Sequence, residues 1–109
     1  MKKLLFAALL MCSFPVLAHL HSDVREKEIV SYSDKTDASI ELTNLYPFGI
    51  DFAVTVNGVY RGNTGEFAPD EADHIHVMLE TSEPGVKVHR VCTESVSAFV
   101  CSTFWTKRY

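Results

Sequence analysis

Residues 50–60 place the strongest constraint on what this chain can fold into. The segment 50–56 alternates apolar residues with more polar ones, the period-2 pattern of a β-strand with one buried face. Asn57-Gly58 follows directly, and a second β-prone run, 59–61, comes after it. Both central residues of a type I′ turn need a positive φ, which Asn tolerates and Gly adopts freely. The pattern therefore predicts a β-hairpin that turns at Asn57-Gly58.

Five other segments also favour strands, at 28–33, 38–43, 73–81, 86–93 and 96–107. Turn-forming residues such as Pro, Gly, Asn and Asp separate them at intervals of roughly ten residues. No segment after the N-terminus shows the period of an amphipathic helix. The chain is therefore expected to be all-β, a small antiparallel β-sandwich of the Ig-like or PEGA-like type with about seven short strands, with a small barrel as the other architecture.

Residue alternation also predicts which side chains form the core. We expect Ala38, Ile40 and Leu42 to share one face of their strand, and Ile75, Val77 and Leu79 to share one face of theirs. The opposite face of the second strand then carries His74, His76, Met78 and Glu80. Aromatic residues of the last segment are expected to fill the core, namely Phe99, Phe104 and Trp105.

The hairpin belongs to a longer pattern. Val54-Thr55-Val56-Asn57-Gly58-Val59-Tyr60-Arg61-Gly62-Asn63-Thr64, continuing through Pro69 to His76-Val77-Met78-Leu79, resembles the PEGA-type repeat of bacterial surface proteins. The resemblance covers residues 54–80, and Gly65 stands where the repeat commonly has Pro. It implies a β-sandwich and carries no implication for function.

The N-terminus has the features of an export signal. Lys2 and Lys3 precede an apolar stretch, and Val16-Leu17-Ala18 offers the small residues that a signal peptidase requires. We expect residues 1–18, including Cys12, to be cleaved as a signal peptide. Residues 19–28 are then expected to form a flexible N-terminal arm and residues 29–109 a single β-sandwich domain. These features favour a periplasmic or secreted bacterial protein.

Charge narrows the classes of partner. The whole chain carries a formal net charge of −4, and loss of the signal would remove two of its lysines and make the charge more negative. Nucleic acids and anionic membranes reward clustered Lys and Arg, so neither is expected as a partner. No segment has the roughly 20 apolar residues of a membrane span. The expected partner is another protein in the envelope or outside the cell, and the sequence leaves the oligomeric state open.

Two cysteines, Cys92 and Cys101, would remain after cleavage. An even pair in a small exported domain predicts a structural disulfide. Redox-active pairs usually have the Cys-x-x-Cys spacing, which this pair lacks. The disulfide would join the last two strands into a C-terminal hairpin.

Histidine is the main candidate for metal chemistry. A mature chain beginning at His19 would present an α-amino group and an imidazole together, with His21 two residues later. His74 and His76 are an i, i+2 pair, so they project from one face of a strand. Nitrogen ligands of this kind suit copper or zinc. A mature N-terminal His also resembles the start of CopC-type copper proteins and of histidine-brace oxidases. The alternative is that these histidines are solvated polar residues.

Catalytic motifs are absent from the sequence. It has no Gly-x-Ser-x-Gly elbow, no Gly-rich phosphate loop and no His-Glu-x-x-His segment. We therefore expect a non-enzymatic binding protein without a cofactor, such as an inhibitor or an immunity-type protein, and a periplasmic copper- or zinc-binding protein is the alternative. Aromatic residues and Arg dominate protein interfaces, so the candidate partner-binding residues are Tyr46, Tyr60 and Arg61.

Overall fold

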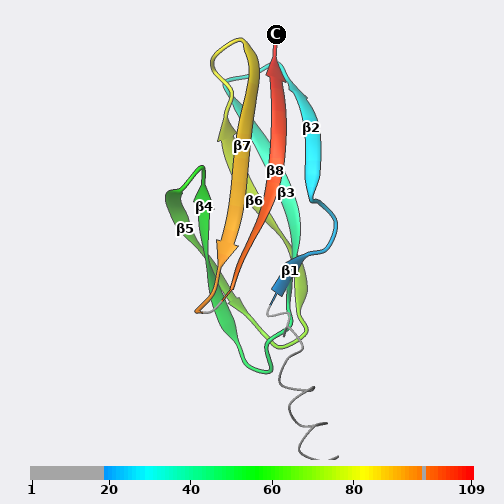
Figure 1. Ribbon diagram of the computed structural model, residues 1–109, viewed down its shortest axis with the longest axis vertical. Coiled ribbons are helices and arrows are strands. Elements are labelled where there is room, and N and C mark those ends of the chain that lie inside the picture. The colour runs from blue at the N-terminus through cyan, green and yellow to red at the C-terminus, as the bar shows by residue number, and fades with distance from the viewer. Residues whose placement is uncertain (1–18, 97) are drawn as a thin grey trace, which may run out of the picture.

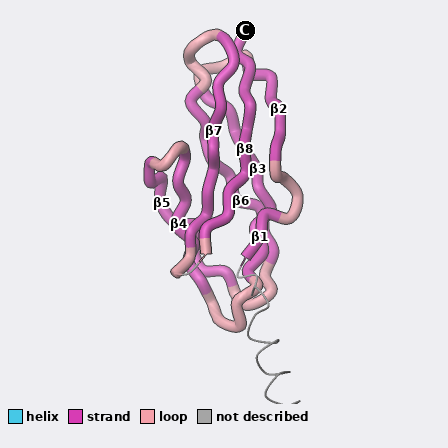
Figure 2. Tube along the Cα trace, in the orientation of Figure 1, coloured by secondary structure: helices cyan, strands magenta, loops and turns pink. Residues whose placement is uncertain are grey.

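The computed structural model describes residues 19–96 and 98–109, and this part of the chain folds into a sandwich of two β-sheets (Figures 1 and 2). One sheet has three strands in the order β1-β3-β6, and the other has five in the order β2-β8-β7-β4-β5. The strands are β1 (His19–His21), β2 (Glu26–Ser31), β3 (Lys35–Asn44), β4 (Ile50–Val56), β5 (Val59–Phe67), β6 (Ala72–Glu80), β7 (Gly85–Glu94) and β8 (Phe99–Arg108). The predicted all-β sandwich is confirmed.

The predicted hairpin is formed by β4 and β5. Asn57 and Gly58 have φ angles of 50° and 83°, so both central residues lie in the positive-φ region that a type I′ turn needs. Register shifts interrupt the β4–β5 pairing, and Gly62 within the irregular part has a φ of 121°. A residue with a Cβ rarely adopts that conformation, so glycine is needed there. The backbone N–H of Asn57 also donates to the carbonyl of Arg90 in β7, at 2.9 Å.

The core lies between the two sheets. One cluster of buried residues contains Ala38, Ile40, Val77 and Leu79 from the three-stranded sheet, packed with Val54, Val56, Val91 and Phe104 from the other. A second cluster joins Leu42 to Ile50, Phe52 and Phe67. The alternation predicted for 38–43, 50–56 and 73–81 is therefore confirmed, because each strand turns its apolar residues inward.

The last strand departs from the prediction for its aromatic residues. Phe104 is fully buried, but Trp105 is 41% exposed and Phe99 57% exposed. Successive side chains of a strand point to opposite faces, so neighbours such as Phe104 and Trp105 cannot both enter the core. Trp105 therefore lies on the outer face of the five-stranded sheet.

The C-terminal hairpin of β7 and β8 carries the predicted disulfide. Cys92 and Cys101 lie directly opposite each other in the antiparallel register and are bonded to each other. On its other edge, β8 pairs in parallel with β2, with Glu26 opposite Thr103 and Ser31 opposite Arg108. This parallel pair is an exception to the expected antiparallel pattern. It places the last strand of the chain inside the five-stranded sheet.

The structure differs from the predicted flexible arm at 19–28. Residues His19–His21 form β1, which pairs with β3, and Glu26–Ser31 form β2. His19 is only 1% exposed, because its ring packs against Phe52 with the centroids 4.7 Å apart. The segment is thus held by contacts with residues distant in sequence. The predicted signal peptide, residues 1–18, lies outside the described residues.

Candidate functional site

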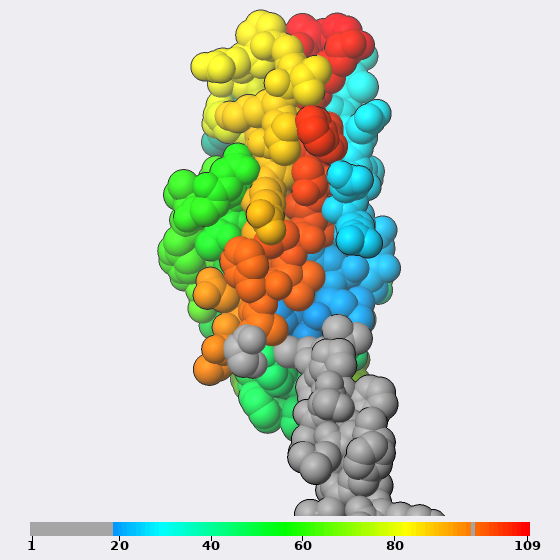
Figure 3. All heavy atoms as spheres, in the orientation of Figure 1, coloured from blue at the N-terminus to red at the C-terminus, as the bar shows by residue number. Residues whose placement is uncertain are grey.

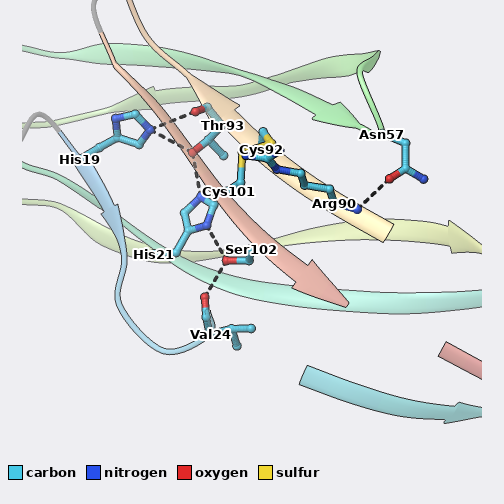
Figure 4. The surroundings of a disulfide bond; sticks show 9 residues. All are labelled: His19, His21, Val24, Asn57, Arg90, Cys92, Thr93, Cys101 and Ser102. Carbon is cyan, nitrogen blue, oxygen red and sulfur yellow. Dashed lines mark hydrogen bonds between the residues drawn. A yellow bond between two sulfur atoms is a disulfide. The ribbon is translucent and has the colours of Figure 1, made fainter. Parts of the chain in front are cut away.

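The histidines of β1 enter a polar cluster between the two sheets, beside the disulfide (Figure 4). Nε2 of His19 lies 3.0 Å from the hydroxyl and 3.1 Å from the carbonyl oxygen of Thr93. His21 bridges two hydroxyls, with Nε2 2.8 Å from Thr93 Oγ1 and Nδ1 2.6 Å from Ser102 Oγ. Thr93 and Ser102 belong to β7 and β8, so the cluster joins β1 to the opposite sheet.

The hydrogen bonds of this cluster fix its protons. The Ser102 hydroxyl donates to the carbonyl of Val24 at 2.6 Å, so Nδ1–H of His21 must donate to Ser102. Nε2 of a neutral His21 then accepts from the Thr93 hydroxyl, and Nε2–H of His19 donates to Thr93. In the part of the chain that the structure describes, Nδ1 of His19 has no hydrogen-bond partner. This set of hydrogen bonds is the one that two neutral rings make.

The pKa values of both histidines follow from this environment. Burial, together with the neighbouring His19, lowers the pKa of His21 to about 4, although Asp23 acts in the opposite direction. Burial also lowers the pKa of His19, against a smaller opposing effect of its hydrogen bond to the Thr93 carbonyl. The cluster acts as a structural anchor for β1 that depends on neutral imidazoles.

His74 and His76 lie elsewhere, on the outer face of the three-stranded sheet. Nε2 of His74 is 3.5 Å from Asp23 Oδ2 and 3.9 Å from Glu41 Oε2, and Nδ1 of His76 is 3.1 Å from Asp37 Oδ2. Each imidazole thus contacts a carboxylate of β3, and His74 also contacts Asp23 of the β1–β2 connection. The predicted face for this pair is confirmed by its exposure.

The four histidines therefore do not form one metal site. His19 and His21 point between the sheets, whereas the other pair points away from them. Over 19–96 and 98–109, no group of three or more His, Cys, Asp or Glu side chains is arranged to hold a metal ion. A metal would have to bind one pair alone, and metal binding stays a prediction.

The three predicted partner-binding residues are also dispersed. Tyr46 lies in the β3–β4 connection, where its hydroxyl is 2.5 Å from Ser95 Oγ. Tyr60 and Arg61 are exposed on β5, and the Tyr60 hydroxyl donates to the side-chain oxygen of Asn63. Of the three, only Arg61 reaches a hollow that other candidate residues share.

That hollow is a groove of about 470 Å³ between β5 and β6, the last strands of the two sheets on this side of the sandwich. We call it the edge groove. It brings Arg61 together with His74 and His76, which the sequence suggested for different functions. Its lining residues are Val54, Arg61, Gly62, Asn63, Thr64, His74, Ile75, His76, Val77 and Met78.

One wall of the edge groove is a strand with an open hydrogen-bonding edge. Among the described strands, β6 pairs only with β3. The N–H of Asn44 donates to the carbonyl of Glu71, and the N–H of Thr81 donates to the carbonyl of Asp34. These two bonds mark the hydrogen-bonded residue pairs at the two ends of the β3–β6 ladder.

Because hydrogen-bonded pairs alternate along an antiparallel ladder, Ile75 and Val77 direct their backbone groups toward β3. His74, His76 and Met78 direct theirs toward the edge groove. The N–H of His74 accordingly bonds to the side chain of Asp73, at 2.8 Å, rather than to β3. The sequence contains no local signal for this edge, since it depends on which strands become neighbours.

Comparison with models of known protein families finds no match, and a search of curated proteins finds none either. The resemblance of residues 54–80 to a PEGA-type repeat therefore stays a prediction. Within the described ranges, no helix is long and apolar enough to cross a membrane.

Proposed function

We propose that this protein is a small exported, non-enzymatic binding protein that takes up an extended segment of another protein along the free edge of β6. The observation that carries the proposal is the edge groove, into which the ladder pattern directs the backbone groups of His76 and Met78. An added strand gains affinity from main-chain hydrogen bonds and specificity from alternate side chains. An inhibitor or immunity-type protein of the bacterial envelope would use such a site.

The floor of the edge groove indicates the kind of segment it would accept. Val54 and Val77 are 8% and 7% exposed, whereas Ile40 and Leu79, deeper in the same core, are fully buried. A strand beside β6 would turn every second side chain toward this floor. The expected segment therefore has apolar residues at alternate positions.

Protection of the other edges also supports β6 as the docking strand. Natural sheet edges are blunted by bulges, charges or short strands. The β4–β5 pairing is irregular, β1 has three residues, and β2 begins with Glu26-Lys27-Glu28. In contrast, β6 has nine residues and a regular register with β3. Among the edge strands of the described residues, β6 is the one that is neither short, nor irregular, nor opened by a charged run.

A proline at Met78 tests the proposal. Met78→Pro removes an N–H that faces the edge groove without removing a bond to β3, so folding should be retained. We expect peptides selected from a random library to carry alternate apolar residues and to bind Met78→Pro at least tenfold more weakly. Amide hydrogen exchange at His76 and Met78 should slow when a selected peptide binds.

The matched control is Met78→Ala, which removes the side chain and keeps the N–H. It should change peptide affinity less than about threefold, because the main-chain hydrogen bonds to the peptide are kept. Equal binding to the Pro and Ala variants, or failure to select any peptide, would contradict strand addition at β6.

The alternative, a copper- or zinc-binding protein, rests on the i, i+2 pair that lines the same groove. Stoichiometric Cu(II) or Zn(II) binding in calorimetry, abolished by His76→Ala, would favour that function instead. Strand addition has the stronger support, because His76 already contacts Asp37 and the histidines of β1 lie in the interior.

A further inference from the structure

The outer face of the five-stranded sheet carries exposed apolar side chains that take no part in the core between the two sheets. Strands β2, β8 and β7 lie side by side, and Figure 3 shows their outer face with β2 in cyan, β8 in red and β7 in yellow to orange. Four apolar residues on it are between 41% and 66% exposed, namely Val30, Val86, Val88 and Trp105. Large exposed apolar patches mark interaction sites.

Strand register arranges this face as three rows. Glu26, Thr103 and Arg90 form the first row, and Glu28, Trp105 and Val88 form the second. The third consists of Val30, Lys107 and Val86. Carboxylates therefore lie on β2, the arginine lies on β7, and Trp105 occupies the centre.

We propose that this face binds the same face of a second copy of the chain, around a two-fold axis that runs along β8. Such an axis places β2 of one copy over β7 of the other, so self-complementary contacts form twice. Glu26 then lies opposite Arg90 of the second copy, and Val30 lies opposite its Val86. The two Trp105 rings, one from each copy, stack on each other. Sheets packed face to face keep their strands roughly aligned, as this axis requires.

The charged residues favour an axis along β8 over the other two-fold axis that would bring the same faces together. A two-fold axis perpendicular to the strands would place β2 of one copy over β2 of the other. The two Glu28 carboxylates would then face each other, and Arg90 would lie opposite Val86 of the second copy. With the axis along β8, the like-charge contact is Lys107 with its copy. The Lys107 ammonium lies over the ring of Tyr109, 5.0 Å from its centroid, which draws it toward the end of the sheet.

Reversing the charges tests the pairing. In sedimentation velocity over a concentration series, the protein as the cell processes it should form a dimer. Glu26→Arg and Arg90→Glu should each raise the dimer dissociation constant at least tenfold, because each breaks two symmetric ion pairs. The double variant, with both charges exchanged, should recover an affinity within about threefold of the wild type.

Trp105 supplies an independent measurement, since it is the only tryptophan in the chain. Its fluorescence emission should shift to shorter wavelength as the dimer forms and loses contact with water. Glu83→Arg, a charge reversal in the exposed β6–β7 turn, is the matched control and should leave both readouts unchanged. A wild-type protein that stays monomeric at several hundred micromolar would overturn the proposal, as would single reversals without effect or a double variant that does not recover.

Discussion

The free energy of unfolding is expected to fall by about 1.5 kcal/mol between pH 6.5 and pH 5 through His21 alone. The pKa of His21 is about 4 in the folded protein and near its ordinary value of 6.5 when the chain is unfolded. Well above pH 6.5 the ring is neutral in both states, and its contribution to stability is complete. As the pH falls from 6.5 toward 4, the unfolded chain gains a proton that the folded protein excludes, so stability is lost. Below pH 4 both states are protonated and the loss stops.

Proton geometry acts together with burial in making the folded state resist protonation. A second proton on His21 would sit at Nε2, where the Thr93 hydroxyl already donates its hydrogen. That hydroxyl cannot turn toward His19, whose Nε2–H also donates to Thr93. Burial lowers the pKa of His19 in the same direction, so the two rings of β1 reinforce each other.

Urea unfolding at several pH values between 6.5 and 5 measures this slope, in a window above the usual range of carboxylate titration. His21→Gln should make the slope shallower by about 1 kcal/mol per pH unit on average over this window. Ser82→Gln, in the exposed β6–β7 turn, changes no titratable group and is the control, so its slope should equal that of the wild type. Equal slopes in the wild type and His21→Gln would contradict the assigned protons.

Loss of the disulfide is expected to lower the free energy of unfolding by about 2–3 kcal/mol, the loop-closure entropy of a short cross-link. In a domain of this size, that corresponds to a fall in Tm of roughly 10–20 °C. Cys92 and Cys101 hold β7 to β8, and β8 is also the strand on which β2 pairs. Loosening this hairpin therefore weakens the attachment of β2 as well. Thermal unfolding of the Cys92→Ala, Cys101→Ala double variant measures the change.

Reductant provides the control for this prediction. Dithiothreitol should lower the Tm of the wild type toward that of the double variant and leave the double variant itself unaffected. Thiol titration of the unfolded, unreduced chain from residue 19 onward should find no free thiols. Two free thiols would show that the bond is not formed in the cell.

Strands in which apolar and polar residues alternate over many positions were predictable, because this pattern depends only on neighbouring residues. Ile40, Phe52 and Val77 each enter the core at the position their alternation predicts, and Asn57-Gly58 turns as its φ preferences require. Aromatic character alone did not predict which rings of the last strand are buried. Phe104 and Trp105 are both aromatic, and the alternation of the pleat separates the buried ring from the exposed one.

Long-range contacts account for what the sequence did not predict. Nothing near His19 indicates that it is buried, because the Thr93 that binds it lies 74 residues away. The edge groove likewise depends on the assignment of β5 and β6 to different sheets, although the two strands are neighbours in the sequence. Arg61, His74 and His76 were predicted as candidates from the sequence. That they line one groove follows from the order of the strands.

The parallel pairing of β2 with β8 has a consequence for the order of folding. Glu26 pairs with Thr103, so this contact closes a loop that spans most of the chain. A nascent chain emerges from the ribosome N-terminus first, so among the described strands the one that pairs with β2 is synthesised last. Non-local contacts of this kind slow folding. The five-stranded sheet therefore cannot be completed until the last residues of the chain have been made.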